Sequence, residues 1–151
     1  MKDLIIVGAS GFGREVLQWV KDFNKLNNCW NIKGFIDDNG QALDGYECDY
    51  TVICSIKDYV PQPNDYFAIA IALPKVKKIV VEILKSREAK FATIIHPTAI
   101  VGDFCQLGEG IVMTPNAKIS PNVKIGNFAT ILGSSFGHDA VVGDFCTITG
   151  N

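Results

Sequence analysis

The chain has 151 residues, 48% of them hydrophobic, and its 14 basic and 16 acidic side chains give a net charge of −2 at pH 7. This composition is typical of a folded protein of one domain or two small ones, and it offers no basic face for a nucleic acid. The sequence has no apolar run long enough to span a membrane, and the start at Met1 lacks the pattern of a signal peptide. Five cysteines without a CxxC pair suit reduced thiols, so we expect a cytoplasmic protein without a disulfide framework or a metal site.

The first 93 residues alternate apolar strands with amphipathic helices. The flat apolar run at residues 4–7 indicates a strand buried on both faces, and Phe12, Val16, Val20 and Phe23 then recur at helical spacing. Strands are predicted at residues 4–7, 33–37, 51–55, 66–73 and 91–95, and helices at residues 12–24 and 74–84. This order predicts an α/β domain over residues 1–93, built on a small doubly wound parallel sheet.

A glycine-rich loop joins the first predicted strand to the first predicted helix. It contains Gly8, Ser10, Gly11 and Gly13. Glycines let the backbone approach a ligand closely, and a helix N-terminus offers free N–H groups to a phosphate. Asp37 and Asp38, at the end of the second strand, can accept hydrogen bonds from a ribose or a base, so we expect nucleotide or nucleotide-sugar binding. The structural alternative is a plain tight turn, and the GxxGxG spacing disfavours both an NAD site and a Walker A loop.

Residues 94–151 carry a six-residue repeat. Aliphatic side chains recur at Val101, Leu107, Met113, Ile119, Ile125 and Ile131. A hexapeptide repeat predicts a parallel β-helix, in which each short strand stacks on its neighbour, and this segment supplies about three coils. Because the chain ends in mid-repeat without a terminal cap, we expect a β-helix domain that is shortened at its C-terminus or covered there by a partner.

The repeat loses its step near a histidine. The next position in step is Gly137, which is not aliphatic, and the pattern resumes one residue early at Val142, so we place the break at His138 and Asp139. A histidine can take a proton from an amine or hydroxyl that attacks an acyl carbonyl, and the carboxylate can fix its tautomer. The structural alternative is a surface histidine in a turn. For His96, at the junction of the two domains, we favour a structural role.

These residues together resemble a known group of enzymes. The motifs are Val7-Gly8-Ala9-Ser10-Gly11-Phe12-Gly13, Gly34-Phe35-Ile36-Asp37-Asp38, Thr93-Ile94-Ile95-His96-Pro97 and Gly137-His138-Asp139. In this order and spacing, the chain resembles the bacterial sugar acetyltransferases of the hexapeptide-repeat superfamily. Within that superfamily it is most similar to the group of sialic acid O-acetyltransferases and UDP-amino-sugar (bacillosamine-type) N-acetyltransferases.

The resemblance implies a fold and a function. The fold would be a Rossmann-like sheet followed by a left-handed parallel β-helix that assembles as a homotrimer, with active sites between subunits. The loop residues and the Asp37-Asp38 pair would bind the nucleotide of an activated sugar, and acetyl-CoA would be the acetyl donor without a metal. His138 would be the general base and Asp139 the acid beside it. Many members carry a second histidine near the coenzyme, at the position of Thr147 here, which makes Thr147 a candidate cofactor-binding residue.

The sequence is compatible with two functions and disfavours a third. The first is an acetyl-CoA-dependent acetyltransferase that acts on an amino or hydroxyl group of a nucleotide-linked sugar in surface-glycan biosynthesis. The second is a truncated, non-catalytic module that binds a nucleotide sugar or serves assembly. The third, a metal-dependent β-helix enzyme, needs about three histidine ligands, and this chain has two histidines in total.

Overall fold

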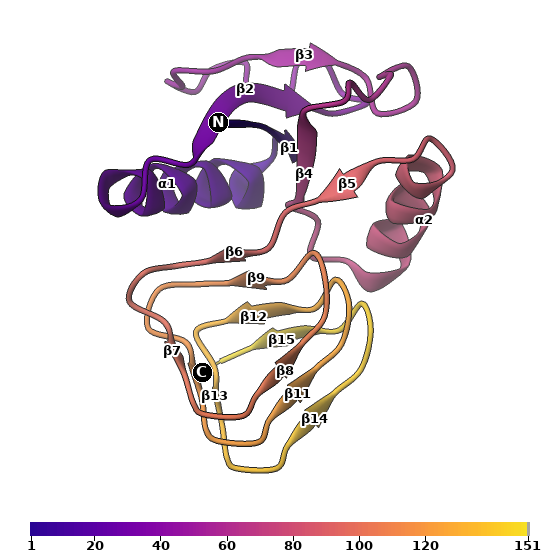
Figure 1. The fold of residues 1–151 in the computed structure, drawn as a ribbon. Helices are drawn as coiled ribbons and strands as arrows, with labels where there is room; N and C mark the ends of the chain where they lie inside the picture. Colours follow the sequence, from indigo (N-terminus) through magenta and orange to yellow (C-terminus); the bar gives the residue numbers. More distant parts are fainter. Residues whose placement is uncertain (151) are drawn as a thin grey trace.

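The computed structural model describes residues 1–150 and joins a small parallel sheet to a β-helix (Figure 1). The sheet has the strand order β3-β2-β1-β4-β5, and every neighbouring pair in it is parallel. Its elements are β1 (Lys2–Val7), α1 (Gly11–Leu26), β2 (Trp30–Ile36), β3 (Val52–Cys54), β4 (Asp65–Ile69), α2 (Pro74–Lys85) and β5 (Lys90–Phe91). The predicted doubly wound sheet is confirmed. Within residues 1–150, no helix is both long and apolar enough to cross a membrane.

The central strand β1 is buried on both faces, which explains its unbroken apolar sequence. Leu4 and Ile6 pack in one core cluster with side chains of α1, and Ile5 and Val7 pack in a second cluster with side chains of α2. All four side chains are fully buried. Because successive side chains of a strand point to opposite faces, the two helices must cover opposite faces of the sheet.

The predicted strand at residues 91–95 is two strands that belong to different sheets. β5 ends at Phe91 and pairs with β4, whereas β6 (Ile94–Ile95) pairs with β9 (Val112–Met113) of the β-helix. The prediction of one strand here was wrong, because a continuous apolar run does not reveal where the chain leaves one sheet for another. β6 begins at Ile94, where the sequence placed the start of the second domain.

The β-helix has three faces, each a parallel stack of short strands. The further strands are β7 (Ile100–Val101), β8 (Gln106–Leu107), β10 (Lys118–Ile119), β11 (Lys124–Ile125), β12 (Thr130–Leu132), β13 (Ser135–Phe136), β14 (Val141–Val142) and β15 (Thr147–Thr149). The stacks are β6-β9-β12-β15, β7-β10-β13 and β8-β11-β14. Aliphatic side chains of the repeat fill the interior, where Met113, Ile119 and Ile131 are at most 1% exposed.

The break in the repeat lies before the histidine. Ile100 pairs with Lys118, 18 residues on, whereas Lys118 pairs with Ser135, 17 residues on. The missing residue therefore falls between β12 and β13, where Gly133 adopts a left-handed φ of 63°. Phe136 pairs with Ile119 and takes the position that aliphatic residues hold elsewhere in the repeat. Our placement of the break at His138 was wrong, because we did not recognise a phenylalanine as a member of the aliphatic row.

Polar contacts join the sheet domain to the β-helix on both sides of the sheet, and the most buried of them involve His96 and Lys77. On the side of α1, His96 is 8% exposed and its Nε2 lies 3.3 Å from Oδ2 of Asp22. On the side of α2, Lys77 is 1% exposed and donates hydrogen bonds to β-helix oxygens. His96 thus lies at the junction, as expected. Both core clusters of the sheet domain also contain β-helix side chains, so the two parts share their hydrophobic cores.

The burial of Lys77 predicts an unusual dependence of stability on pH. Burial lowers the pKa of Lys77 to about 8 from its ordinary value of 10.5, and the charge of Cys146 acts in the opposite direction. Between these pH values the unfolded chain keeps the proton and the folded chain has lost it, so this group makes the free energy of unfolding rise with pH. We expect wild type to gain about 1–3 kcal/mol relative to Lys77→Met between pH 8 and pH 10 in urea titrations. Parallel pH profiles for the two proteins would contradict this account.

Candidate functional site

The glycine loop is tight because backbone segments cross at close range within it. Gly8 has a left-handed φ of 100°, and a Cβ there would lie 2.7 Å from the carbonyl oxygen of Ala70. A Cβ on Gly13 would lie 2.0 Å from the carbonyl oxygen of Gly8. These two positions therefore require glycine, whereas a Cβ on Gly11 would meet only the far end of Arg14, at 3.7 Å. The loop brings the N-terminus of α1 close against the end of β1.

The residue that caps α1 leaves its side chain free. Ser10 is the N-cap of α1, yet its hydroxyl makes no capping hydrogen bond to the helix backbone. The first turn of α1 contains no acidic side chain, so its positive dipole end is not offset there. The hydroxyl and the free N–H groups of this first turn are donors that an anionic group can use.

The two aspartates after β2 are engaged with the backbone around the loop. Asp37 accepts hydrogen bonds at 2.8 Å from the N–H of Ala9 through Oδ2 and at 2.8 Å from the N–H of Asn39 through Oδ1. Asp38 is exposed and accepts one hydrogen bond at 3.2 Å from the N–H of Lys57. Asp37 therefore fixes the glycine loop to the end of β2, and Asp38 has the more available carboxylate.

These residues meet at a cavity of about 400 Å³ beside the carboxyl ends of β1, β2 and β4. The polar part of its lining comes from Gly8, Ser10, Asp37 and Asp38. An apolar part is formed by Phe12, Ile56, Ala70, Ile71, Ala72, Leu73, Val76 and Val80. In open α/β sheets, ligands bind in this kind of crevice, where neighbouring strands connect in opposite directions. Gly11 and Gly13 shape the turn and do not line the cavity.

The apolar wall is the part of the cavity that sequence reasoning missed. Besides Phe12 and Ile56, it comes from the connection between β4 and α2 and from the first turns of α2, which the sequence marked only as a strand end and an apolar helix face. The available signal was positional: this connection follows a strand next to β1, so its residues border the same crevice. A wall of this kind suits the face of a nucleotide base or a sugar ring.

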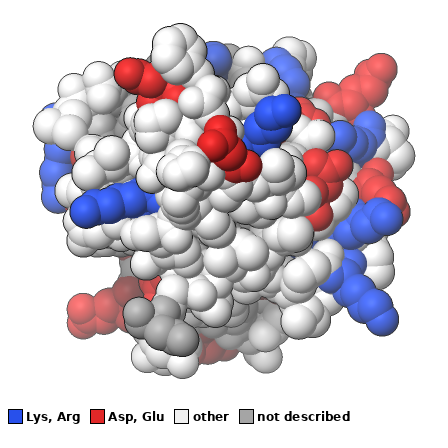
Figure 2. Space-filling model, turned by 90° about the horizontal axis from the view of Figure 1, so that it is seen from below, with Lys and Arg blue, Asp and Glu red and all other residues white. Residues whose placement is uncertain are grey.

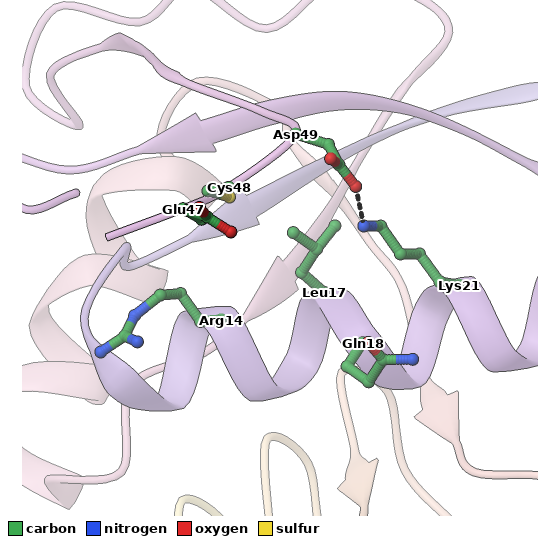
Figure 3. A pocket seen from close by; sticks show the side chains of 7 residues that line it. All are labelled: Arg14, Leu17, Gln18, Lys21, Glu47, Cys48 and Asp49. Atoms are coloured by element: carbon green, nitrogen blue, oxygen red, sulfur yellow. Dashed lines mark hydrogen bonds and ion pairs between the residues drawn. The ribbon is translucent and has the colours of Figure 1, made fainter. Parts of the chain in front are cut away.

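A second hollow, of about 330 Å³, lies between α1 and residues 47–49 (Figure 3). Figure 3 shows Lys21 paired with Asp49, while Arg14 points away from that pair. The guanidinium of Arg14 stacks on the ring of Tyr46 at 3.8 Å. The lining carries two basic side chains and two acidic ones, Glu47 and Asp49, and it contains none of the residues that the sequence nominated. This hollow therefore gives no anion a net positive field.

His138 and Asp139 lie in the turn between β13 and β14. Nδ1 of His138 is 2.7 Å from Oδ2 of Asp139, and their side chains are 82% and 72% exposed. When Nδ1 carries a proton and donates it to the carboxylate, Nε2 is left as the proton acceptor, directed away from Asp139. The pair therefore has the arrangement of a base and its orienting acid, with solvent on nearly all sides.

The turn is a regular corner of the β-helix. Asp139 has a left-handed φ of 64°, as do Asn122 and Phe104 at the same corner of the two preceding coils, with values of 64° and 61°. The N–H of Asp139 donates to the carbonyl oxygen of Pro121 at 3.2 Å, which stacks this coil on the one before. An aspartate tolerates the left-handed region better than most residues, so Asp139 also has a structural role at this corner.

Within one chain, the cavity at the glycine loop and the His138–Asp139 pair lie apart. In Figure 1 the turn from β13 to β14 lies at the bottom of the β-helix, and the sheet lies above the opposite face. Figure 2 views the molecule from below and shows a white, uncharged area across the middle of that face, just below acidic and basic side chains. Near this corner, Ile100, Phe104 and Val141 are 55%, 82% and 74% exposed. The corner thus combines an exposed polar pair with exposed apolar side chains.

Thr147 lies in the junction between the domains. Its hydroxyl donates to the carbonyl oxygen of Ala72 and accepts a hydrogen bond from Nζ of Lys77 at 3.1 Å. Both contacts join the β-helix to the wall of the cavity. The hydroxyl is thereby engaged in the structure, and the contact of Thr147 with a coenzyme stays a prediction. Among residues 1–150, no group of three or more His, Cys, Asp or Glu side chains is placed to hold a metal ion.

Comparison with known families and curated proteins agrees with the predicted resemblance. The family model described as the PglD N-terminal domain matches residues 3–84. The GDP-perosamine N-acetyltransferase of Escherichia coli O157:H7 is 32% identical over 148 residues, which cover 94% of this chain and 65% of that protein. The UDP-N-acetylbacillosamine N-acetyltransferase of Bacillus subtilis (strain 168) is 27% identical over 75% of this chain and 51% of its own length. The chain thus spans between half and two thirds of these relatives.

Solved structures share the fold. The acetyltransferase domain of PglB from Neisseria gonorrhoeae FA1090 has a TM-score of 0.84 at 20% identity, covering 99% of this chain and 71% of that one. A point mutant of the Caulobacter crescentus GDP-perosamine N-acetyl transferase, in complex with CoA and GDP-perosamine, has a TM-score of 0.81 at 18% identity, covering 97% and 68%. The predicted fold, a Rossmann-like sheet followed by a left-handed parallel β-helix, is confirmed.

The tight loop makes a prediction that a matched pair of variants can test. Gly13→Ala places a methyl group against the backbone of Gly8, so we expect the free energy of unfolding to fall by about 2 kcal/mol or more. Gly40→Ala is the control, since a Cβ there meets nothing within 4 Å, and it should change stability by less than about 0.5 kcal/mol. Urea titrations of the two variants provide the measurement. Equal free energies of unfolding for Gly13→Ala and Gly40→Ala would show that the loop accommodates the methyl group without strain.

Proposed function

The chain belongs to the PglD N-terminal domain family, and we propose that it is an acetyl-CoA-dependent acetyltransferase that acts on an amino or hydroxyl group of a nucleotide-linked sugar. One chain contains both a glycine loop that can hold a phosphate beside an apolar cavity and a histidine on the β-helix that can act as a base. The presence of these two features carries the proposal. The names of the two curated relatives support it, since both describe N-acetyltransferases, one of a GDP-linked sugar and one of a UDP-linked amino sugar.

In this proposal the cavity holds the nucleotide of the acceptor. The diphosphate lies at the N-terminus of α1, where N–H groups and the hydroxyl of Ser10 donate to its oxygens. The ribose or base donates hydrogen bonds to the carboxylate of Asp38, while Asp37 keeps the loop closed by accepting from the N–H of Ala9. The base or sugar ring packs on the apolar wall that includes Leu73 and Val76. The complex of the Caulobacter crescentus enzyme with GDP-perosamine supports this class of ligand.

The proposed chemistry is direct transfer with His138 as the base. Acetyl-CoA supplies an activated acetyl group as a thioester. Nε2 of His138 removes the proton from the sugar amine or hydroxyl as that group forms a bond to the thioester carbonyl carbon. The carbon–sulfur bond then breaks, and the proton on His138 passes to the leaving thiolate, so the base is regenerated. Asp139 holds the proton on Nδ1 and stabilises the imidazolium between the two steps.

We further propose that the site is completed by a second copy of the chain, in a homotrimer. The separation of the cavity from the histidine within one chain supports this, because one chain alone leaves His138 82% exposed. Apolar side chains beside the same corner, such as Phe104 and Val141, offer area for such a contact. In a closed ring, every copy would present its corner to the cavity of the next copy.

The place of the reaction is part of the same proposal. The curated relatives are named for acetylation of activated amino sugars, which supports a role in surface-glycan biosynthesis in the cytoplasm. The alternative is a nucleotide-sugar-binding module without catalysis. One observation favours it: the cavity is formed within this chain, whereas the His138–Asp139 pair has no enclosing wall of its own.

Replacing the proposed base separates the two functions. His138→Ala should lower the rate of acetyl transfer by about 10²–10⁴-fold, while the affinity for nucleotide sugar stays within about twofold, because the cavity is untouched. Product is followed by mass spectrometry and binding by calorimetry. Asp103→Ala is the matched control, as it removes an exposed side chain at the equivalent position of the same corner in an earlier coil. A His138→Ala variant with full activity would refute this role of the histidine.

The acid beside the base gives a finer test. Asp139→Asn keeps a residue that accepts the left-handed backbone, but an amide does not stabilise the imidazolium as a carboxylate does. We expect kcat to fall by at least about tenfold with an unchanged melting temperature. Steady-state kinetics and a thermal melt provide the two readouts. An unchanged kcat would assign Asp139 to the turn alone.

A further inference from the structure

Lys77 is a buried amine held by four oxygens of the β-helix. It lies in the first turns of α2 and is 1% exposed. Nζ lies 2.9 Å from the carbonyl oxygen of Phe128, 3.0 Å from Oγ1 of Thr130, 3.1 Å from Oγ1 of Thr147 and 3.5 Å from the carbonyl oxygen of Cys146. These acceptors come from two successive coils, at and before the starts of β12 and β15. One side chain of the sheet domain therefore forms hydrogen bonds to two coils of the β-helix.

Burying the charged amine of Lys77 costs more free energy than filling the same space with an apolar side chain. Among residues 1–150, no carboxylate forms an ion pair with Lys77, so its charge is balanced only by the dipoles of neutral oxygens. Replacing a buried charged network with an apolar side chain of similar size often leaves a protein as stable or more stable. What directional hydrogen bonds provide, and apolar packing does not, is a defined orientation of one element on another.

The element that Lys77 orients is the apolar wall of the cavity at the glycine loop. Val76, next to Lys77 in the chain, lines the cavity, and so does Ala72. The hydroxyl that Lys77 contacts on Thr147 donates to the carbonyl oxygen of Ala72. Two hydrogen bonds thus run from Lys77 through Thr147 to the cavity wall. The other contacts of Lys77 run to the coils that follow and precede the His138 corner in the chain.

We propose that Lys77 is a positioning residue, which sets the cavity wall on the β-helix so that a bound sugar is aligned with the acetyl-transfer chemistry. Lys77 touches neither reactant and acts through Thr147 and α2. Its kinetic consequence rests on the proposed function. Its structural consequence, the coupling of the two domains, does not.

The test compares Lys77→Met with Lys78→Met in the full chain. The first change removes the cation and its donors but keeps a long apolar side chain, and the second makes the same change at an exposed neighbour with no recorded polar contact. Calorimetric titration with GDP and with UDP counts the folded sites that bind nucleotide. Acetyl transfer is then expressed as kcat per nucleotide-binding site, which removes any loss that comes merely from unfolded protein.

We expect Lys77→Met to lower kcat per site by about 10- to 100-fold, because misplacement of a substrate by about 1 Å has effects of that size. The dissociation constant of the nucleotide and the KM of the sugar should stay within about threefold, and Lys78→Met should match wild type. A Lys77→Met variant with wild-type kcat per site would overturn the proposal. So would an equal loss in Lys78→Met.

A second readout keeps the two proposals separate. Hydrogen exchange of α2 is that readout, because the two domains share their hydrophobic cores and Lys77→Met removes only polar contacts between them. The amides of α2 should exchange at least about tenfold faster in Lys77→Met than in Lys78→Met, since the helix is held less firmly on the β-helix. If wild type transfers no acetyl group, the proposed function fails, and this difference in exchange alone decides whether Lys77 couples the domains. If Lys77→Met does not fold, Thr147→Val removes the shared hydroxyl with little change of shape, and it should show the same fall in kcat per site and the same faster exchange.

Discussion

The structure depends on one constraint, that each coil of the β-helix must stack in register on the coil before it. A corner residue then occupies the same place in every coil, so His138 and Asp139 stand directly in line with Pro121 and Asn122. The five-residue unit before Phe136 is accommodated at Gly133, at another corner, and leaves the His138 corner regular. The candidate dyad is thereby presented on a rigid edge, which is what a base of fixed direction needs.

The same register also determines where the sheet domain lies on the β-helix. One face of the β-helix, which begins with β6, lies under the sheet domain and contributes to both of its core clusters. Lys77 and His96 add directional contacts on the two sides of this interface. The cavity and the exposed corner are consequently held on opposite sides of one body. This separation is the reason for our proposal that the two are drawn from different copies of the chain.

The sequence was sufficient wherever periodicity carried the information. The buried strand β1, the amphipathic helix α1 and the hexapeptide stacks follow from spacing alone, and the glycine loop follows from its place between a strand and a helix. It was insufficient where one residue type serves an uncommon purpose. Phe136 takes a position that aliphatic residues hold in the other coils. Both carboxylate oxygens of Asp37 accept hydrogen bonds from backbone N–H groups. Lys77, on a helix with other lysines, gives no local sign that it is buried, because its partners lie more than 50 residues away.

The most direct test of the central claim is complementation between two inactive chains. One chain carries His138→Ala, and the other carries Val76→Glu, which adds a negative charge to the cavity wall and should repel a nucleotide diphosphate. Each variant alone should transfer acetyl groups to a nucleotide-linked amino sugar at least about 10²-fold more slowly than wild type. Co-expressed, they should recover about a quarter of the wild-type rate, because some intact cavities then face an intact dyad on a neighbouring copy. Two active single variants, or a co-expressed pair with no activity, would contradict a site shared between chains.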